Sequence, residues 1–265
     1  MHVPTHKILA DSQRKLADFF RRTGSAHVRV LLLGYDGTLA PCSDPERPAL
    51  HPAIPALLQR ILHAARTRLV IVTGRRAFDA IEFLGLKRIE VWGCHGLERL
   101  RADGTYEMPE VEPRVLQAIF KAGELLAREG LTSLAEHKPA GIAIHWKALG
   151  DASAEVEVKV RRVWSALPDA NGLCLRKFDG GMEIRAAARN RGDTVRTILS
   201  ELRGGASVAY LGDDETDEDA FAALQGYGLG VLVRRDYRPT VADVWIQPPE
   251  GLVAFLTEWA AASGD

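Results

Sequence analysis

The chain has few cysteines, almost no net charge and no zinc-type or redox-type cysteine pair. Its 265 residues include three cysteines, Cys42, Cys94 and Cys174, an odd number without CxxC spacing. A disulfide framework is therefore not expected, and a reducing cytoplasm is the expected location. The formal net charge of −1 supplies no field that would attract nucleic acid or an anionic membrane, so neither is an expected partner.

Long apolar runs are also missing. None of the runs approaches the about 18 residues that a membrane span needs. The first 25 residues mix Leu9, Leu16 and Phe19 with Lys, Arg and Asp, which predicts an amphipathic helix rather than a signal peptide. A hydrophobic content of 46% is ordinary for a globular protein with one large domain or two modest ones.

Short apolar runs without polar alternation are present instead, and they are typical of strands that are covered on both faces. Residues 54–65 place apolar side chains at helical spacing between the first two runs, and another helical pattern follows Gly192. The chain therefore predicts a doubly wound α/β core with a Rossmann-like parallel sheet. Its predicted strands are Val28–Gly34, Arg68–Gly74, Ile89–Gly96, Ser207–Asp214 and Gly228–Val233.

The stretch 109–186 has a different pattern. Helical spacing at 115–128 and 152–167 accompanies an alternation around Ile142 and Ile144 that is typical of a half-exposed antiparallel strand. A hairpin is expected to turn at 179–181. We therefore expect an inserted α+β cap domain, 109–186, within a core formed by 1–108 and 187–265, closing over the ligand end of the core sheet.

Four of the predicted core strands end in chemically suggestive sequences, GYDGT, TGRR, GCHGLE and GDDETDED. Ligands of parallel α/β sheets bind beyond the carboxyl ends of the strands. Crowded carboxylates at Asp213, Asp214 and Asp217 repel one another unless a cation neutralises them, and Mg²⁺ is the obvious candidate. The alternative is an acidic helix N-terminus favoured by the helix dipole. The Thr73 hydroxyl could hold a phosphate oxygen, although Thr-Gly is also a plain turn.

Two further groups are interpreted as structural. Cys94 beside His95 could suggest a thiol nucleophile, but neighbours on a strand point to opposite faces. The basic cluster Arg234, Arg235 and Arg238 is interpreted as a solvated surface.

Taken together, these motifs resemble the haloacid dehalogenase (HAD) superfamily of phosphohydrolases, and more closely its trehalose-6-phosphate phosphatases. From about Val28 onward, YDGTLAP, VTGR, HGLE, EHKPAGIAIHWK, MEIR and LGDDETDEDAF occur in the family's order. The resemblance implies a HAD-like core, a cap, Mg²⁺, and hydrolysis of trehalose 6-phosphate to trehalose and phosphate. It also implies a functional link to a trehalose-phosphate synthase.

The resemblance carries roles onto residues of the predicted core. Asp36 matches the general acid and base, and its backbone carbonyl would ligate the metal. Thr73 matches the phosphate-positioning residue. Asp213 matches the metal-binding carboxylate, supported by Asp214 and Asp217.

Further matches concern the sugar. Glu136, Lys138 and Glu183 in the cap match residues that contact the disaccharide, and His95 with Gly96 would line the cleft from the core side. For Glu136 and Lys138 the alternative is an exposed strand pair, and His95 could be a satisfied strand-end histidine. Sucrose phosphate and glucosylglycerol phosphate phosphatases share the same core logic, so the sugar stays open.

The chain departs from the family at two positions. Gly34 stands where the family has the aspartate that attacks phosphorus and binds Mg²⁺. Arg191 stands where the family usually has a lysine, and it keeps the charge without the compact ammonium. Loss of a nucleophile costs orders of magnitude in rate, while ground-state binding can survive. Three interpretations remain: a phosphatase that uses water or a displaced side chain, a sugar-phosphate-binding protein with little chemistry, and an introduced glycine.

Overall fold

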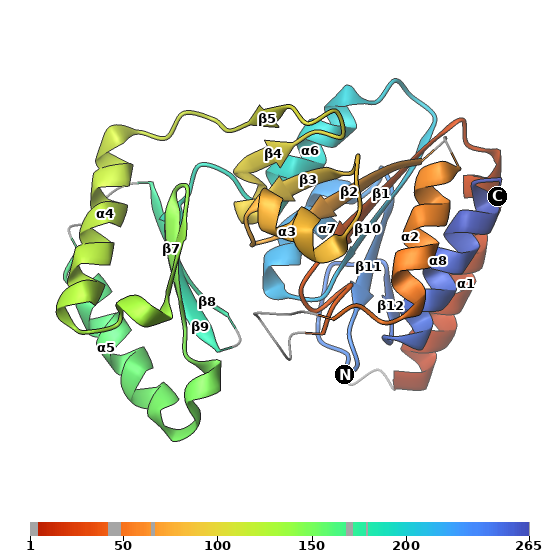
Figure 1. Cartoon of the computed structure of the whole chain (residues 1–265). Coiled ribbons are helices and arrows are strands. Elements are labelled where there is room, and N and C mark those ends of the chain that lie inside the picture. The colour runs from red at the N-terminus through yellow and green to blue at the C-terminus, as the bar shows by residue number, and fades with distance from the viewer. Residues whose placement is uncertain (1–4, 42–48, 65–66, 168–171, 179, 265) are drawn as a thin grey trace. The chain divides into compact units, whose positions relative to one another are not determined.

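The structure is a computed structural model that describes residues 5–41, 49–64, 67–167, 172–178 and 180–264 (Figure 1). It divides into two compact units, which we call the core unit (Met1–Met108 with Asn190–Asp265) and the cap unit (Pro109–Arg189). The sequence placed the second boundary at 186/187. Cys42 and Asp179, which figured in the sequence analysis, lie outside the described residues.

The core unit contains an eight-stranded sheet with the order β12-β11-β10-β1-β2-β3-β4-β5. β1 lies between β10 and β2 and pairs with both in parallel, which confirms the predicted Rossmann-like sheet. β4 and β5 extend it by antiparallel pairing, which the sequence analysis did not predict. The strands are β1 (Val28–Gly34), β2 (Thr67–Val72), β3 (Glu90–Gly93), β4 (Glu98–Leu100), β5 (Tyr106–Glu107), β10 (Ala206–Gly212), β11 (Leu229–Val233) and β12 (Val244–Ile246).

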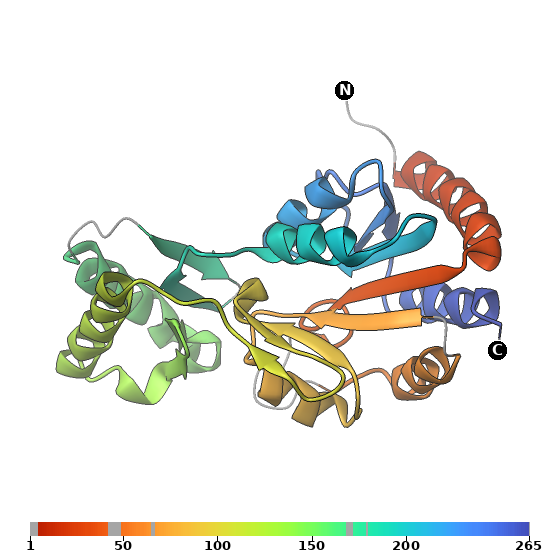
Figure 2. The ribbon, with the colours of Figure 1, turned by 90° about the horizontal axis from the view of Figure 1, so that it is seen from above.

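Helices cover both faces of this sheet (Figures 1 and 2). Leu31 and Leu33 of β1 pack into one buried cluster, while Val30 and Leu32 pack into the other. This alternation explains why the strand reads as a continuous apolar run. The first cluster involves α1 (Thr5–Ser25), α2 (Ala53–His63), α3 (Ala77–Leu84) and α8 (Glu250–Ala262), and the second involves α6 (Arg191–Glu201) and α7 (Glu218–Leu224).

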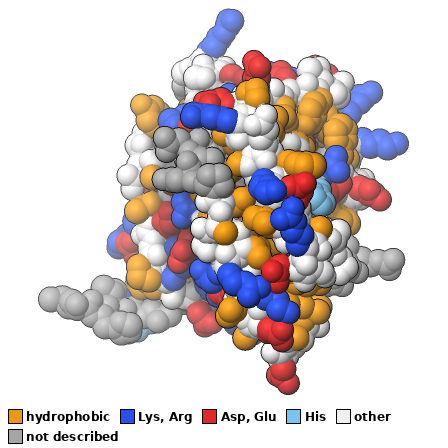
Figure 3. Space-filling model, turned by 90° about the vertical axis from the view of Figure 1, so that its left-hand side faces the viewer, with side chains coloured by type: hydrophobic (Ala, Val, Ile, Leu, Met, Phe, Trp, Pro, Cys, Tyr) orange, Lys and Arg blue, Asp and Glu red, His pale blue; other side chains and the backbone are white. Residues whose placement is uncertain are grey.

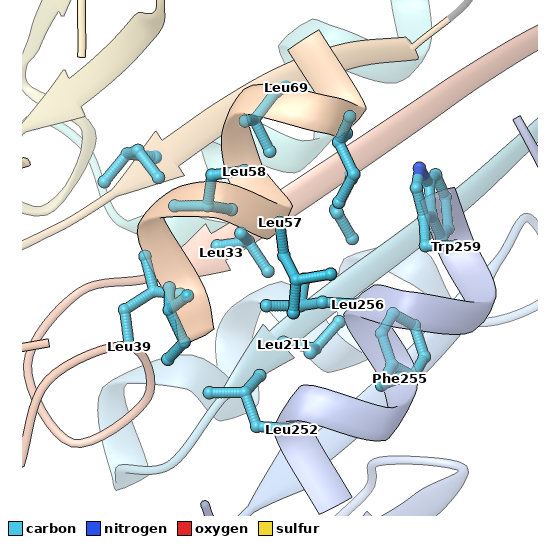
Figure 4. Packing of buried hydrophobic residues seen from close by; sticks show 14 of the residues in the cluster. Leu33, Leu39, Leu57, Leu58, Leu69, Leu211, Leu252, Phe255, Leu256 and Trp259 are labelled. Carbon is cyan, nitrogen blue, oxygen red and sulfur yellow. The ribbon is translucent and has the colours of Figure 1, made fainter. Parts of the chain in front are cut away.

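Figure 4 shows the first cluster at close range. Leu33 and Leu211 come from neighbouring strands, and Leu57, Leu58 and Leu256 reach them from α2 and α8. All five side chains are buried. Full burial of a leucine contributes about 1.5–3 kcal/mol, so this packing holds the ends of β1 and β10 firmly in place. None of the helices within the described residues combines the length and the apolar character of a membrane span.

The third predicted strand is too long. β3 stops at Gly93, and Cys94–Gly96 form a short 3₁₀ turn in which Cys94 and His95 have φ values of 48° and 59°. The strand-face argument therefore does not apply to Cys94 and His95. The Cys94 thiol instead donates to Oε1 of the buried Glu98 at 2.9 Å, so it has a structural partner.

The cap unit has an antiparallel sheet with the order β6-β7-β9-β8, and two helices contact it. Ile142 reaches Gly123 of a helix, and its register partner Ile184 lies on the same face. β7 pairs antiparallel as predicted but is buried rather than half-exposed at four of its five positions. The elements are α4 (Pro113–Arg128), β6 (Ala135–Lys138), β7 (Gly141–His145), α5 (Ser153–Ser165), β8 (Leu173–Phe178) and β9 (Gly181–Ala186).

Candidate functional site

The loop after β1 folds back over the end of its own strand. The main-chain N–H groups of Leu39 and Ala40 both donate to the Tyr35 carbonyl, at 2.9 and 3.0 Å. Gly37 has a φ of +76°, which favours glycine at this turn. The turn returns Thr38 to the neighbourhood of Gly34, the last residue of β1.

The Thr38 hydroxyl lies close to the place that the Cβ of any larger residue would take at position 34. A Cβ added to Gly34 would lie 2.7 Å from Thr38 Oγ1 and 3.3 Å from the Leu211 carbonyl oxygen. Thr38 is only 3% exposed, and its hydroxyl donates to Asp213 Oδ1 at 3.2 Å. The end of β1 is therefore a closely packed position, and its neighbour is Asp213, the residue that follows the adjacent strand β10.

The Asp213 carboxylate lies against the main chain of Gly37, where any Cβ would collide with it. Burial and the nearby charges of Asp217 and Asp214 raise the pKa of Asp213 to about 8. This carboxyl group is therefore costly to ionise in the absence of a cation, and a bound divalent cation would lower that cost.

Asp217 is a fully buried carboxylate with four partners. It accepts from the main-chain N–H groups of Asp213 and Asp214 at 3.0 and 3.1 Å, and from the Tyr210 hydroxyl at 2.5 Å. Arg191 forms a buried ion pair with it. Burial alone would raise the pKa of Asp217, but the Arg191 charge and the Tyr210 hydroxyl keep it below its usual range. Arg191 and Asp217 thus shape the acidic loop together.

Asp36, the predicted acid and base, pairs with Arg75. The guanidinium Nε lies 2.8 Å from Asp36 Oδ2, and Nη2 lies 2.7 Å from Oδ1. Arg75 also lies over the rings of Tyr35 and Phe83, at 5.8 and 5.2 Å. The sequence analysis did not single out Arg75, although it stands in the quoted TGRR motif.

Thr73 follows β2 and is fastened to the turn after β3. Its carbonyl accepts from the His95 N–H at 2.8 Å, and its hydroxyl accepts from the Arg75 N–H at 3.1 Å. The His95 ring packs on Gly74, where a Cβ would lie 2.7 Å from Nε2. Gly96, with a φ of +96°, approaches the Thr194 hydroxyl of α6. The core residues predicted for phosphate and cation therefore gather at the ends of adjoining strands.

The four predicted metal ligands, Asp36, Asp213, Asp214 and Asp217, do not form a ready-made cage. Across the described residues, no group of three or more His, Cys, Asp or Glu side chains could hold a metal ion. Arg75 engages Asp36, and Asp214 Oδ1 accepts from the Thr216 N–H at 2.7 Å. Mg²⁺ often takes one or two carboxylates together with waters and substrate phosphates. The donor set fits Mg²⁺ in that form, with Asp213 as the carboxylate, and these ligand assignments remain predictions.

The three predicted sugar residues of the cap unit lie on one face of its sheet. Glu136, Ala143 and Glu183 are register partners across β6, β7 and β9. Lys138 Nζ lies 2.7 Å from Glu183 Oε1 and 4.0 Å from Glu136 Oε2. The Lys138 side chain is only 8% exposed, so an exposed strand pair does not describe these residues.

His145, which the sequence analysis did not propose, joins this cap cluster. Its Nε2 lies 2.8 Å from Glu136 Oε2, and its ring lies 5.3 Å from that of Phe178. Burial would raise the pKa of Glu136, but the His145 hydrogen bond and the Lys138 charge lower it below the usual value. The alternating IAIH pattern already placed His145 on the face opposite to Ile144.

Charged side chains are mixed on the face of the molecule shown in Figure 3. Lys and Arg occur there beside Asp, Glu and apolar side chains rather than as one basic field. This distribution agrees with the small net charge of the chain.

Comparisons with known proteins agree on one family. The model of the family described as trehalose-phosphatase matches residues 32–239. The trehalose-phosphate phosphatase of Mycobacterium marinum is 31% identical over 246 residues, which cover 88% of this chain and 61% of that protein. The chain thus spans less than two thirds of the length of the mycobacterial relatives it matches.

Solved structures share the fold. The C-terminal domain of C. albicans trehalose-6-phosphate phosphatase has a TM-score of 0.77 at 18% identity, covering 93% of this chain and 96% of that domain. A HAD-superfamily phosphatase from Bacteroides thetaiotaomicron has a TM-score of 0.57 at 19% identity, covering 89% and 96%. At these identities the likeness concerns the fold alone.

Proposed function

Because the chain belongs to the trehalose-phosphatase family, we propose that it binds trehalose 6-phosphate and hydrolyses it slowly to trehalose and phosphate. The observation that carries the proposal is the gathering of Asp36, Thr73 and Asp213 at the ends of β1, β2 and β10. We assign the phosphoryl group to these core residues and the disaccharide to Glu136, Lys138 and Glu183 of the cap unit.

Each residue has a distinct task in this proposal. The Thr73 hydroxyl, which accepts from the Arg75 N–H, donates its own proton to a phosphate oxygen. Asp36, oriented by Arg75, moves protons to and from the reacting oxygens. Mg²⁺, when held by Asp213 and the Asp36 carbonyl, supplies neutralising charge for the phosphoryl group.

The slow rate follows from Gly34. With a nucleophilic carboxylate, one acid–base residue can protonate the leaving sugar in a first step and activate water in a second. Without it, water must attack phosphorus as the P–O bond to the sugar breaks on the opposite side. Asp36 can then take the proton from water or give one to the sugar oxygen, but it cannot do both in a single step.

Calorimetric titration tests the binding part. We expect trehalose 6-phosphate to bind the wild-type chain more tightly with Mg²⁺ than without it. Asp213→Asn should remove this Mg²⁺ dependence, whereas Glu136→Gln should weaken trehalose 6-phosphate binding and leave inorganic phosphate binding unchanged. Absence of heat with and without Mg²⁺ would count against the proposal. Sucrose phosphate and glucosylglycerol phosphate, titrated in parallel, identify the preferred sugar.

A second candidate function is sugar-phosphate binding without turnover. The packing of Thr38 at Gly34 and the ion pair of Arg191 with Asp217 favour it, because the attacking aspartate and the lysine of the family are both replaced. Measurable binding with no phosphate release in excess enzyme would establish this function.

We also propose that the reaction takes place in the cytoplasm and is linked to a trehalose-phosphate synthase. The location is supported by the odd number of cysteines and the lack of CxxC spacing, which do not indicate a disulfide framework. The synthase link is supported by family membership alone.

A further inference from the structure

The basic segment after β11 contacts the acidic loop, contrary to its interpretation as a solvated surface. Arg238 Nη2 donates to the Asp214 carbonyl at 2.7 Å, and Arg238 Nε lies 3.4 Å from the Asp213 carbonyl. Arg234 Nη1 also lies 3.4 Å from the Asp213 carbonyl, but Arg234 is exposed. Arg238, with its side chain 18% exposed, is the main contact.

The Arg238 guanidinium is itself held in place. It forms an ion pair with Glu218 at the start of α7. Glu218 also accepts from the Thr240 hydroxyl and the Val241 N–H, both at 2.8 Å. Glu218 holds the guanidinium and is itself held by Thr240 and Val241. Arg238 can therefore fix the position of the carbonyls that it binds.

The turn at Asp213–Asp214 is therefore held from two sides. Asp217 accepts from its N–H groups, and Arg238 donates to its carbonyl groups. Charge-assisted hydrogen bonds of this kind are about twice as strong as neutral ones. The turn carries two neighbouring carboxylates whose mutual repulsion opposes a fixed arrangement.

We propose that Arg238 is a positioning residue that fixes the Asp213–Asp214 turn and so aims the Asp213 carboxylate at Thr38 and a divalent cation. The cation part rests on the proposed function. Residues that orient metal ligands typically change metal affinity by about 10–100-fold when they are replaced.

The test compares Arg238→Gln and Arg238→Lys with Arg235→Gln. The control removes the same charge from the same segment, and no hydrogen bond or ion pair of the Arg235 side chain occurs among the described residues. Hydrogen–deuterium exchange of the peptide spanning 211–217 reports the turn, and calorimetric titration with Mg²⁺ alone reports the cation site. Thermal unfolding checks that each variant is folded.

We expect Arg238→Gln to accelerate exchange in that peptide and to weaken Mg²⁺ binding at least about tenfold. Arg238→Lys should recover part of both effects, and Arg235→Gln should match the wild type. Unchanged exchange in Arg238→Gln, or equal effects of Arg238→Gln and Arg235→Gln, would overturn the positioning role while leaving the proposed function intact. A wild-type chain that binds no Mg²⁺ would overturn the cation role and the proposed Mg²⁺ dependence together.

Discussion

Gly34 and Thr38 pack closely at the end of β1. Thr38 is a buried β-branched residue, and its hydroxyl bonds to Asp213. It therefore cannot rotate away without losing a partner. The space beside Gly34 is thus occupied by the Thr38 side chain and is not empty.

We predict that Gly34→Ala destabilises the protein by about 1–3 kcal/mol, the usual cost of overpacking. The control is Gly24→Ala, in the helix α1, where no atom lies within 4 Å of an added Cβ. This control should be neutral or stabilising by up to about 1 kcal/mol. Urea unfolding measures both variants, and equal stability of Gly34→Ala and the wild type would show that the Thr38 packing is loose.

The Arg191–Asp217 pair supports a second prediction at the residue scale. Asp217→Asn leaves the Arg191 charge buried without its counterion, which should destabilise the protein by about 3–5 kcal/mol. Asp18→Asn, which removes an exposed partner of Arg21, should change stability by about 0–1 kcal/mol. Thermal and urea unfolding check both. If the two variants were equally stable, Asp217 would not support the acidic loop as described.

The cap sheet gives a prediction at the scale of an element. Glu136 has a folded-state pKa below the ordinary 4.5, because His145 and Lys138 outweigh the effect of burial. Its stabilising contribution is therefore complete above about pH 4.5 and is lost as the pH falls through the lower folded-state value. We expect Glu136→Gln to reduce stability at pH 7 and to flatten the loss of stability below pH 4.5. The control Glu258→Gln, at an exposed position of α8, should keep the wild-type profile in unfolding measured from pH 3 to 7.

The strands also show how much of the fold the sequence can predict. β1 has the predicted bounds, because a continuous apolar run between two helical segments leaves little choice. β3 ends early, because hydrogen bonds from the turn after it to Thr73 and Arg75 hold Cys94 and His95 at positive φ. These bonds join residues far apart in sequence. β4, β5 and β12 have two or three residues each, too few for a periodic pattern.

At the scale of the whole molecule, the sequence motifs predicted which residues lie together at the site, but not which hydrogen bonds and ion pairs they form. The order of the parallel strands was sufficient to bring Asp36, Thr73 and Asp213 to one edge of the core sheet. The partners Arg75, Tyr210 and Arg238 depend on side-chain directions that no sequence pattern records. Arg191 illustrates the difference, since the sequence analysis noted its charge but did not predict its ion pair with Asp217.

The central claim is that the core retains a phosphate and cation site whose attacking carboxylate is missing. Phosphate release from trehalose 6-phosphate with Mg²⁺, measured for the wild type and for Gly34→Asp, tests it most directly. Circular dichroism checks that Gly34→Asp is folded despite the Thr38 contact. The control is the double variant Gly34→Asp with Asp36→Asn, which should abolish any gain in the rate of phosphate release. We predict a gain on the order of 10³-fold or more for Gly34→Asp. A wild-type rate already equal to that of Gly34→Asp would contradict the account.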